Sequence, residues 1–217
     1  MHRRRTALAV SAALLAAAPL LTACGNDAHP GAAAVVGGDR ITVAQLQSRV
    51  GEVRAAQQSA TAKSGQYEQA VEKTGSLTRD TLQSMVLDKV LHRAATDAGV
   101  TVSRKEFQDL RAKLETQAGG AKALEMGWLQ QYSIPPSRID DSLRTEIEAQ
   151  KLYEKLGVDP SSDEGQAAFW SALSKASKAL KIDVNPRYGK WDVTKSQRAD
   201  ATTPWIREDS AAARKQA

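Results

Sequence analysis

The sequence predicts a mainly α-helical fold, with a small β element that joins the N- and C-terminal segments of the folded domain. First, the stretch 78–117 carries apolar residues at helical spacing on both sides of Gly99. Second, the interior is rich in Ala, Leu, Lys, Glu, Gln and Arg, and aromatic residues make up only 5% of the chain. That composition favours closely packed helices. Third, short segments with strand-like patterns lie near the two ends, at 35–42 and 182–184.

The first residues have the features of an export signal. Arg3–Arg5 precede an apolar run from Ala7 to Leu21, which small residues follow. A helix of that run is about 22 Å long, short of the ~30 Å hydrocarbon core, so a lasting membrane span is the weaker interpretation. Removal of the three arginines lowers the net charge from +5 to +2, because no acidic residue precedes Asp27. The twin-arginine route is an alternative means of export.

The only cysteine of the chain, Cys24, ends the apolar run. The sequence Leu21-Thr22-Ala23-Cys24 resembles the lipobox of bacterial lipoproteins. The resemblance implies removal of the signal peptide 1–23 and attachment of a diacylglyceryl group, with acyl chains such as palmitate, to the Cys24 sulfur. The small-residue segment 24–34 is then a tether. The alternative is a secreted protein with a chance cysteine, and a lone cysteine excludes an intramolecular disulfide.

The folded domain is expected to begin with a hairpin, whose turn is Gly37-Gly38-Asp39. Thr42 and Gln45 form a predicted capping box for the first helix, and Ile41 can pack on Leu46. Beyond Ala56 the chain is polar, so we expect a fraying helix end and a mobile loop.

Two helices that meet at a sharp corner form the predicted centre of the domain. The first is expected to start at Thr78 and to end at Gly99. The second starts with a capping box of Ser103 and Glu106, while Val102 and Phe107 flank the cap as a hydrophobic staple. We expect the rest of the domain to pack around this pair of helices.

The apolar spacing predicts three further helices after this pair. Gly119-Gly120 precedes a short helix over 121–132, and the prolines at 135 and 136 precede a long amphipathic helix that ends at Gly157. The last helix is expected over 161–181, with Ser161 and Glu164 as a capping box. A strand at 182–184 then leads to the end of the domain at 192, and the polar segment 193–217 is predicted to be disordered.

Catalytic and cofactor sites are not expected. His92 is the only histidine within the predicted domain and sits mid-helix, where a structural or surface role is the favoured interpretation. Asp140-Asp141 lie in a first helical turn, where acidic side chains favour the helix dipole. Mixed charges along the helices disfavour nucleic-acid binding. We therefore predict neither an enzyme nor a metal or cofactor site.

The order of hairpin, GGDRIT turn, helix, and a helix that ends AATDAGVTVSRKEF resembles the N-terminal module of the SurA/PrsA foldases. Two later stretches, QQYSIPPSRIDDSLRTEIEAQKLYEKLGV and KIDVNPRYGKWD, extend the resemblance over about residues 34–192. It implies a helical, trigger-factor-C-like bundle whose closing segment pairs with the N-terminal hairpin. In that family a prolyl isomerase domain follows the long helix. Here only Val158–Pro160 lies there, whereas a domain needs about 50 residues, so isomerase activity is not expected.

The predicted function is that of a lipid-anchored chaperone, or holdase, which binds unfolded secreted polypeptides at the extracytoplasmic face of the membrane. The alternative is a scaffold lipoprotein for one dedicated envelope partner, and the oligomeric state is left open. Large apolar side chains are candidates for peptide binding, because methionine adapts to varied partners and aromatic rings anchor them. They are also candidates for ordinary core residues. The six are Met85, Met126, Trp128, Tyr132, Phe169 and Trp170.

Overall fold

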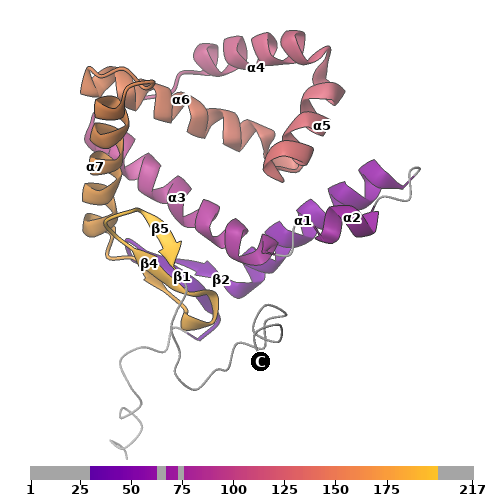
Figure 1. Cartoon of the computed structure of the whole chain (residues 1–217), viewed down its shortest axis with the longest axis horizontal. Helices are drawn as coiled ribbons and strands as arrows, with labels where there is room; N and C mark the ends of the chain where they lie inside the picture. The colour runs from indigo at the N-terminus through magenta and orange to yellow at the C-terminus, as the bar shows by residue number, and fades with distance from the viewer. Residues whose placement is uncertain (1–29, 63–66, 73–75, 200–217) are drawn as a thin grey trace, which may run out of the picture. The chain divides into compact units, whose positions relative to one another are not determined.

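A computed structural model of the chain describes residues 30–62, 67–72 and 76–199 (Figure 1). The predicted signal peptide, Cys24 and most of the predicted tether lie outside these ranges. The helices are α1 (Val43–Thr61), α2 (Tyr67–Glu72), α3 (Leu77–Asp97), α4 (Arg104–Ala118), α5 (Ala121–Tyr132), α6 (Ile139–Leu156) and α7 (Asp163–Leu180). The strands are β1 (Ala32–Val36), β2 (Asp39–Thr42), β3 (Asp183–Val184), β4 (Lys190–Asp192) and β5 (Gln197–Ala199), and two 3-10 turns are η1 (Pro136–Arg138) and η2 (Pro186–Tyr188). The mainly α-helical prediction is confirmed.

A three-stranded antiparallel sheet of order β2-β1-β3 joins the two ends of the domain. Ala34 faces Val184 across the β1–β3 pair, and the Asn185 amide N–H donates to the Ala33 carbonyl over 3.0 Å. This confirms the predicted pairing of the closing segment with the N-terminal hairpin. Strand β1 begins at Ala32, so three residues assigned to the tether belong to the sheet. The turn residue Gly37 has a φ of 62°, and a Cβ there would lie 2.7 Å from the Leu180 side chain.

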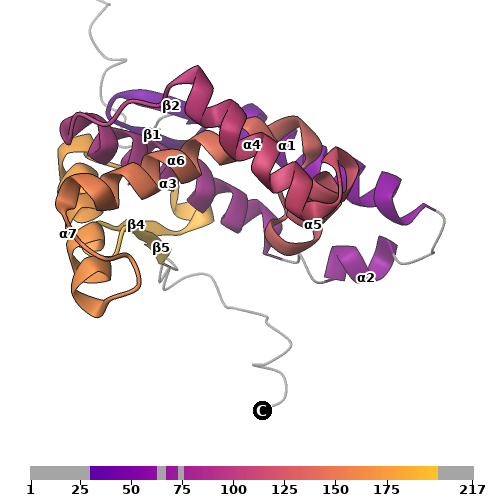
Figure 2. The ribbon, with the colours of Figure 1, turned by 90° about the horizontal axis from the view of Figure 1, so that it is seen from above.

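Helix α1 starts as predicted. The Thr42 hydroxyl accepts from the Gln45 amide over 3.0 Å, and the Gln45 side chain accepts from the Thr42 amide over 2.8 Å. Beyond Ala56, where a fraying end and a mobile loop were expected, α1 continues to Thr61 and the polar stretch also forms α2. Residues 63–66 and 73–75 of this stretch lie outside the described part. In α2 no described side chain is buried, so the apolar pattern that predicts buried helices gives no signal there. Helices α2 and α7 lie at opposite ends of this set of elements (Figure 2).

Helix α3 is the hub of the domain and contacts α1, α6, α7 and β1. Leu82, Val86 and Val90 on its buried face are at most 1% exposed. It starts at Leu77, one residue before the predicted start at Thr78, and its N-cap is Ser76. The Ser76 hydroxyl bonds to the Asp80 carboxylate without capping a backbone N–H. The apolar face of α3 thus forms the main core with the sheet and α7.

Helix α4 has the predicted capping box: the Ser103 hydroxyl accepts from the Glu106 amide over 3.2 Å. The expectation that α3 and α4 together form the centre was only partly right. Helix α4 packs mainly against α5 and α6, which form a three-sided arrangement with it beside α3 (Figure 1). A second, separate core lies among these helices, because the apolar face of α4 is narrow and turns toward them. Its buried members are Phe107, Leu124, Ile139, Leu143 and Ile147.

Helix α6 ends at Gly157 as predicted, where φ is 68°. Helix α7 begins at Asp163, two residues after the expected start at 161, with Ser162 in place of Ser161 as the N-cap. The Ser161 hydroxyl instead donates to the Asp159 carboxylate over 2.7 Å, while the Ser162 hydroxyl accepts from the Gly165 amide over 3.0 Å. A local turn around the aspartate therefore decides which serine caps the helix.

Strands β4 and β5 form a second, two-stranded sheet, of which β4 ends at the predicted end of the domain and β5 lies beyond it. The prediction of disorder from residue 193 was therefore wrong for Gln197–Ala199, and residues 200–217 lie outside the described part. A buried hydrogen bond of 3.0 Å between the hydroxyls of Ser177 and Ser196 fixes the connection to α7. Within the described residues, no helix has the length and hydropathy that a membrane span requires.

Candidate functional site

Two adjoining hollows lie along α3 and α6, and together we call them the α3–α6 groove. The inner hollow has a volume of about 160 Å³ and is also lined by α1 and by the segment that connects α5 to η1. The outer hollow has a volume of about 540 Å³ and extends to the β1–β2 turn and the end of α7. The two share the side chains of Arg49, Asp88, Asp141 and Thr145, so the groove is continuous.

The groove exists because two helices present polar stripes to each other beside their apolar faces. On α3, Thr81, Ser84 and Asp88 follow at spacings of three and four, which places them on one side of the helix. On α6, Asp141 and Ser142 precede Thr145 by four and three residues, and Glu148 follows Thr145 by three, which places them on one side of that helix. The apolar faces pack into the two cores, and the polar sides are left to line an open groove.

An ion pair between α1 and η1 holds one end of the inner hollow. The Arg138 guanidinium binds the Glu52 carboxylate through two bonds, of 2.9 Å from Nε and 3.1 Å from Nη2. The Ser137 hydroxyl adds a third bond to Glu52 of 3.1 Å. The bond from Arg138 lowers the pKa of Glu52, and the bond to Glu52 raises the pKa of Arg138. This pairing fixes the start of α6 against α1.

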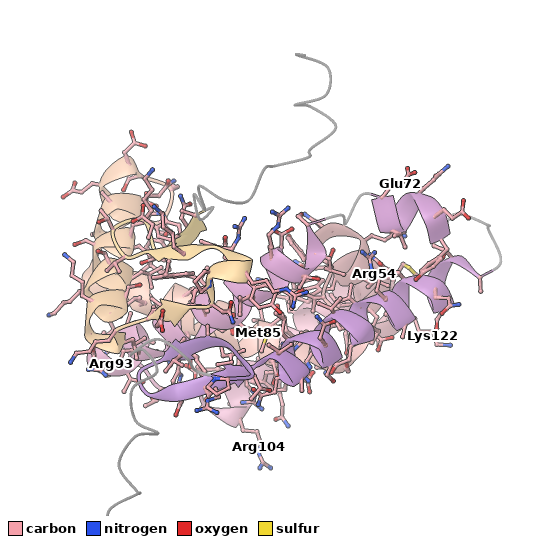
Figure 3. The ribbon with its side chains drawn as sticks, turned by 90° about the horizontal axis from the view of Figure 1, so that it is seen from below. Arg54, Glu72, Met85, Arg93, Arg104 and Lys122 are labelled. Atoms are coloured by element: carbon pink, nitrogen blue, oxygen red, sulfur yellow. The ribbon has the colours of Figure 1, made fainter. Side chains whose placement is uncertain are left out.

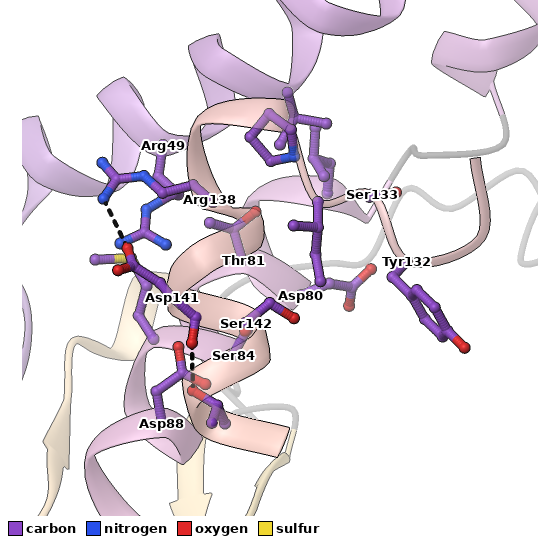
Figure 4. A pocket seen from close by; sticks show the side chains of 16 residues that line it. Arg49, Asp80, Thr81, Ser84, Asp88, Tyr132, Ser133, Arg138, Asp141 and Ser142 are labelled. Atoms are coloured by element: carbon purple, nitrogen blue, oxygen red, sulfur yellow. Dashed lines mark hydrogen bonds and ion pairs between the residues drawn. The ribbon is translucent and has the colours of Figure 1, made fainter. Parts of the chain in front are cut away.

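Asp88 is the most perturbed acid of the groove. Its side chain is half-buried on α3, and desolvation raises the pKa of Asp88 to about 6 from 3.8. The positive charge of Arg49 on α1 lowers the pKa of Asp88, whereas the negative charges of Asp141 and Glu148 on α6 raise it further. No described residue forms a hydrogen bond or a close ion pair with the Asp88 carboxylate, which Figure 4 shows among the side chains of the inner hollow.

The outer hollow carries paired charges. Lys89 Nζ lies 3.0 Å from the Asp39 carboxylate, and His92 Nδ1 lies 2.8 Å from Glu148. His92 is exposed, and its side chain joins α3 to α6 as a surface bond. Within the described residues, no group of acidic, histidine or cysteine side chains is arranged to hold a metal ion.

Three of the predicted peptide-binding residues lie at or beside the inner hollow. Met85 and Tyr132 line it directly, and the Trp128 ring contacts Tyr132 edge-on, with centroids 5.7 Å apart. Met85 and Trp128 are half-buried, whereas Tyr132 is 54% exposed. Figure 3 shows Met85 deep among the helices, while Arg104 on α4 projects outward. Met126 is exposed on the same helix as Trp128.

The other two predicted residues lie elsewhere. Phe169 belongs to the main core, is 8% exposed, and stacks on Tyr153 with ring centroids 4.4 Å apart. Trp170 is exposed on α7. Helices α5 and α7 flank opposite ends of α6, a helix about 27 Å long. The six residues therefore do not form one surface, and Phe169 is not exposed to a ligand in this structure.

Arg49 and Asp88 were not among the sequence-based candidates. Asp88 could have been identified from the sequence, because it is a carboxylate within the widest apolar stripe of the chain. An unpaired charge in such a stripe destabilises the fold. Arg49 gives no comparable signal, because its position opposite Asp88 depends on how α1 crosses α3.

The family model described as the SurA-like N-terminal domain matches residues 2–131, more than half of the chain. The chain belongs to this family. A relative named "Chaperone SurA", from Burkholderia lata, is 30% identical over 156 residues, which cover 69% of this chain and 32% of the relative. The chain thus spans about a third of the length of that relative. No solved structure matches the chain.

The match to the SurA-like N-terminal domain covers one side of the groove. Residues 2–131 include the β1–β2 hairpin, α1, α3, α4 and all but the last residue of α5. Arg49, Asp88 and Met85 lie within the match, whereas Arg138 and the polar stripe of α6 follow it.

Proposed function

We propose that this SurA-like domain is a chaperone that holds unfolded polypeptides in the α3–α6 groove without catalysing a reaction on them. The observation that carries the proposal is the composition of the inner hollow. Met85, Tyr132 and Ile134 offer apolar contacts beside unpaired charged groups and hydroxyls. Such a lining suits a polypeptide segment, which combines apolar side chains with a polar main chain. Family membership and the named chaperone relative support the same role.

The proposal places the domain at the extracytoplasmic face of the membrane, anchored through Cys24. The lipobox-like sequence around Cys24 supports this location. Two attached acyl chains contribute about 0.8 kcal/mol for each buried methylene, which is sufficient for stable attachment. Residues 24–31 then connect the anchor to β1, the first described strand. Mass spectrometry of the membrane-extracted protein tests the anchor, since a free N-terminal cysteine or an uncleaved signal contradicts it.

Suppression of aggregation tests the holding function. We expect the protein to keep a chemically unfolded client in solution, as measured by light scattering. Replacing Tyr132 by serine removes an exposed aromatic of the groove and should weaken the effect. Trp170→Ser is the matched control, because it removes an exposed aromatic from α7, outside the groove. Aggregation that proceeds unchanged at several-fold molar excess of the protein contradicts the proposal.

A scaffold for one dedicated envelope protein is the second candidate. The exposed side chains of Leu156 and Trp170, on α6 and α7 outside the groove, favour it. Pull-down from solubilised membranes separates the two functions. Many unfolded clients support the chaperone, whereas a single partner at fixed stoichiometry, lost on Trp170→Ser, supports the scaffold.

A further inference from the structure

Two opposite charges face the α3–α6 groove without contacting each other. Arg49 from α1 and Asp88 from α3 line both hollows. They are close enough for Arg49 to counteract the rise in the pKa of Asp88, yet they form no ion pair within the 4.0 Å that defines one. In the described part of the chain, neither side chain has a hydrogen-bonded partner. Asp88 lines both hollows and its side chain is only half-buried, so a ligand in the groove can reach it.

This lack of partners is unusual for the groove. The remaining charged side chains that line it have partners in ion pairs, hydrogen bonds or ring contacts. The pairs are Lys89–Asp39, His92–Glu148, Arg93–Asp97, Arg138–Asp141, Asp80–Ser76 and Arg144 over the Phe107 ring. Half-buried charges that remain unpaired destabilise a fold, so Arg49 and Asp88 are the groups that a ligand would satisfy.

The surrounding charges favour a neutral, dipolar ligand over an ion. A cation bound at Asp88 is repelled by the guanidinium of Arg49. An anion bound at Arg49 is repelled by the carboxylates of Asp88 and Asp141. A peptide amide avoids both conflicts, because it carries a donor and an acceptor and no net charge. In an unfolded chain these main-chain groups lack intramolecular partners.

We propose that Arg49 and Asp88 bind the main chain of an extended client segment, with Asp88 accepting from an amide N–H and Arg49 donating to a carbonyl oxygen. The apolar side chains of the same segment then contact Met85 and Tyr132. Because burial desolvates Asp88, a hydrogen bond there is stronger than one in open water. Recognition of the main chain gives binding that depends little on client sequence. This inference rests on the proposed chaperone function.

The test uses a fluorescein-labelled dodecapeptide of alternating apolar and uncharged polar residues. In a series of derivatives, one amide at a time is replaced by an ester, which removes a single N–H donor without adding bulk. Binding to the purified full chain is measured by fluorescence anisotropy. We expect at least one ester position to lower the affinity about tenfold or more, as loss of a hydrogen bond to a charged group does.

The Asp88→Ala variant makes the test specific. Its helix is maintained because alanine suits a helix interior and a destabilising charge is removed. In this variant the sensitive ester should change affinity less than about twofold, since the acceptor is gone. Asp109→Ala on α4 is the matched control, where the full ester effect should persist, because Asp109 is exposed and lies outside the groove.

The outcomes separate this inference from the proposed function. Tight peptide binding with no sensitive ester position overturns the inference alone. An ester effect of the same size in Asp88→Ala also overturns it alone, because another group is then the acceptor. If the full chain neither binds the unmodified peptide nor suppresses aggregation, both the inference and the chaperone function are wrong.

Discussion

Replacing Asp88 by asparagine should stabilise the protein in a pH-dependent way. The pKa of Asp88 is raised from 3.8 to about 6 in the folded state. Well below pH 3.8 the carboxyl is protonated in both states and has no effect on stability. Between these values the unfolded state loses its proton first, so folding becomes less favourable as the pH rises. Above pH 6 the full cost applies, about 3 kcal/mol for a shift of about two units. Asparagine cannot ionise, so the Asp88→Asn variant does not have this loss of stability.

Urea unfolding of wild type and Asp88→Asn at pH values from 4 to 8 measures this effect. The gain in the free energy of unfolding should be about 0.5 kcal/mol at pH 4 and should reach about 3 kcal/mol at pH 8. Asp109→Asn is the control, because it removes an exposed carboxylate that pairs with Lys105 at 2.6 Å. A gain that is independent of pH refutes the reasoning, and so does a loss of stability at pH 8.

Three further predictions concern the contacts that hold the fold. The Glu52→Gln and Arg138→Gln variants should show a coupling of about 1 kcal/mol in a double-mutant cycle by urea unfolding, because the ion pair is only partly buried; additive effects contradict it. Ser103→Ala should lower the free energy of unfolding by about 1 kcal/mol, since it removes the cap of α4; an unchanged urea midpoint contradicts it. Truncation after Leu180 removes β3 and should abolish cooperative thermal unfolding, whereas an unchanged melting curve by circular dichroism argues against it.

Helix ends were the part of the fold that the sequence predicted best, because the interactions that set them are local. The capping boxes at Thr42 and Ser103 involve residues three apart, and Gly157 ends α6 through its own backbone conformation. The prediction of Ser161 as the N-cap of α7 was wrong, because the Ser161 hydroxyl binds the Asp159 carboxylate instead. Neighbouring side chains thus moved the N-cap of that helix by one residue.

Tertiary placement was harder to predict. The stripe that contains Phe107 indicates that α4 is buried on one face, but not that α5 and α6 cover that face in place of α3. Likewise, Arg49 and Asp88 come from different helices, and only the packing of α1 on α3 brings them to one groove. Strand β5 was missed because a short polar segment has no periodic pattern, and its order depends on the bond from Ser196 to Ser177.

The position of β1 between β2 and β3 has a consequence for biogenesis. A chain that emerges N-terminus first exposes one hydrogen-bonding edge of β1 until residues 183–184 arrive. Pairings between such distant residues form late and slowly. During that interval the vacant edge can recruit a strand from another nascent copy, which would produce a domain-swapped assembly. Vectorial synthesis therefore leaves this small sheet incomplete until β3 emerges, after α7.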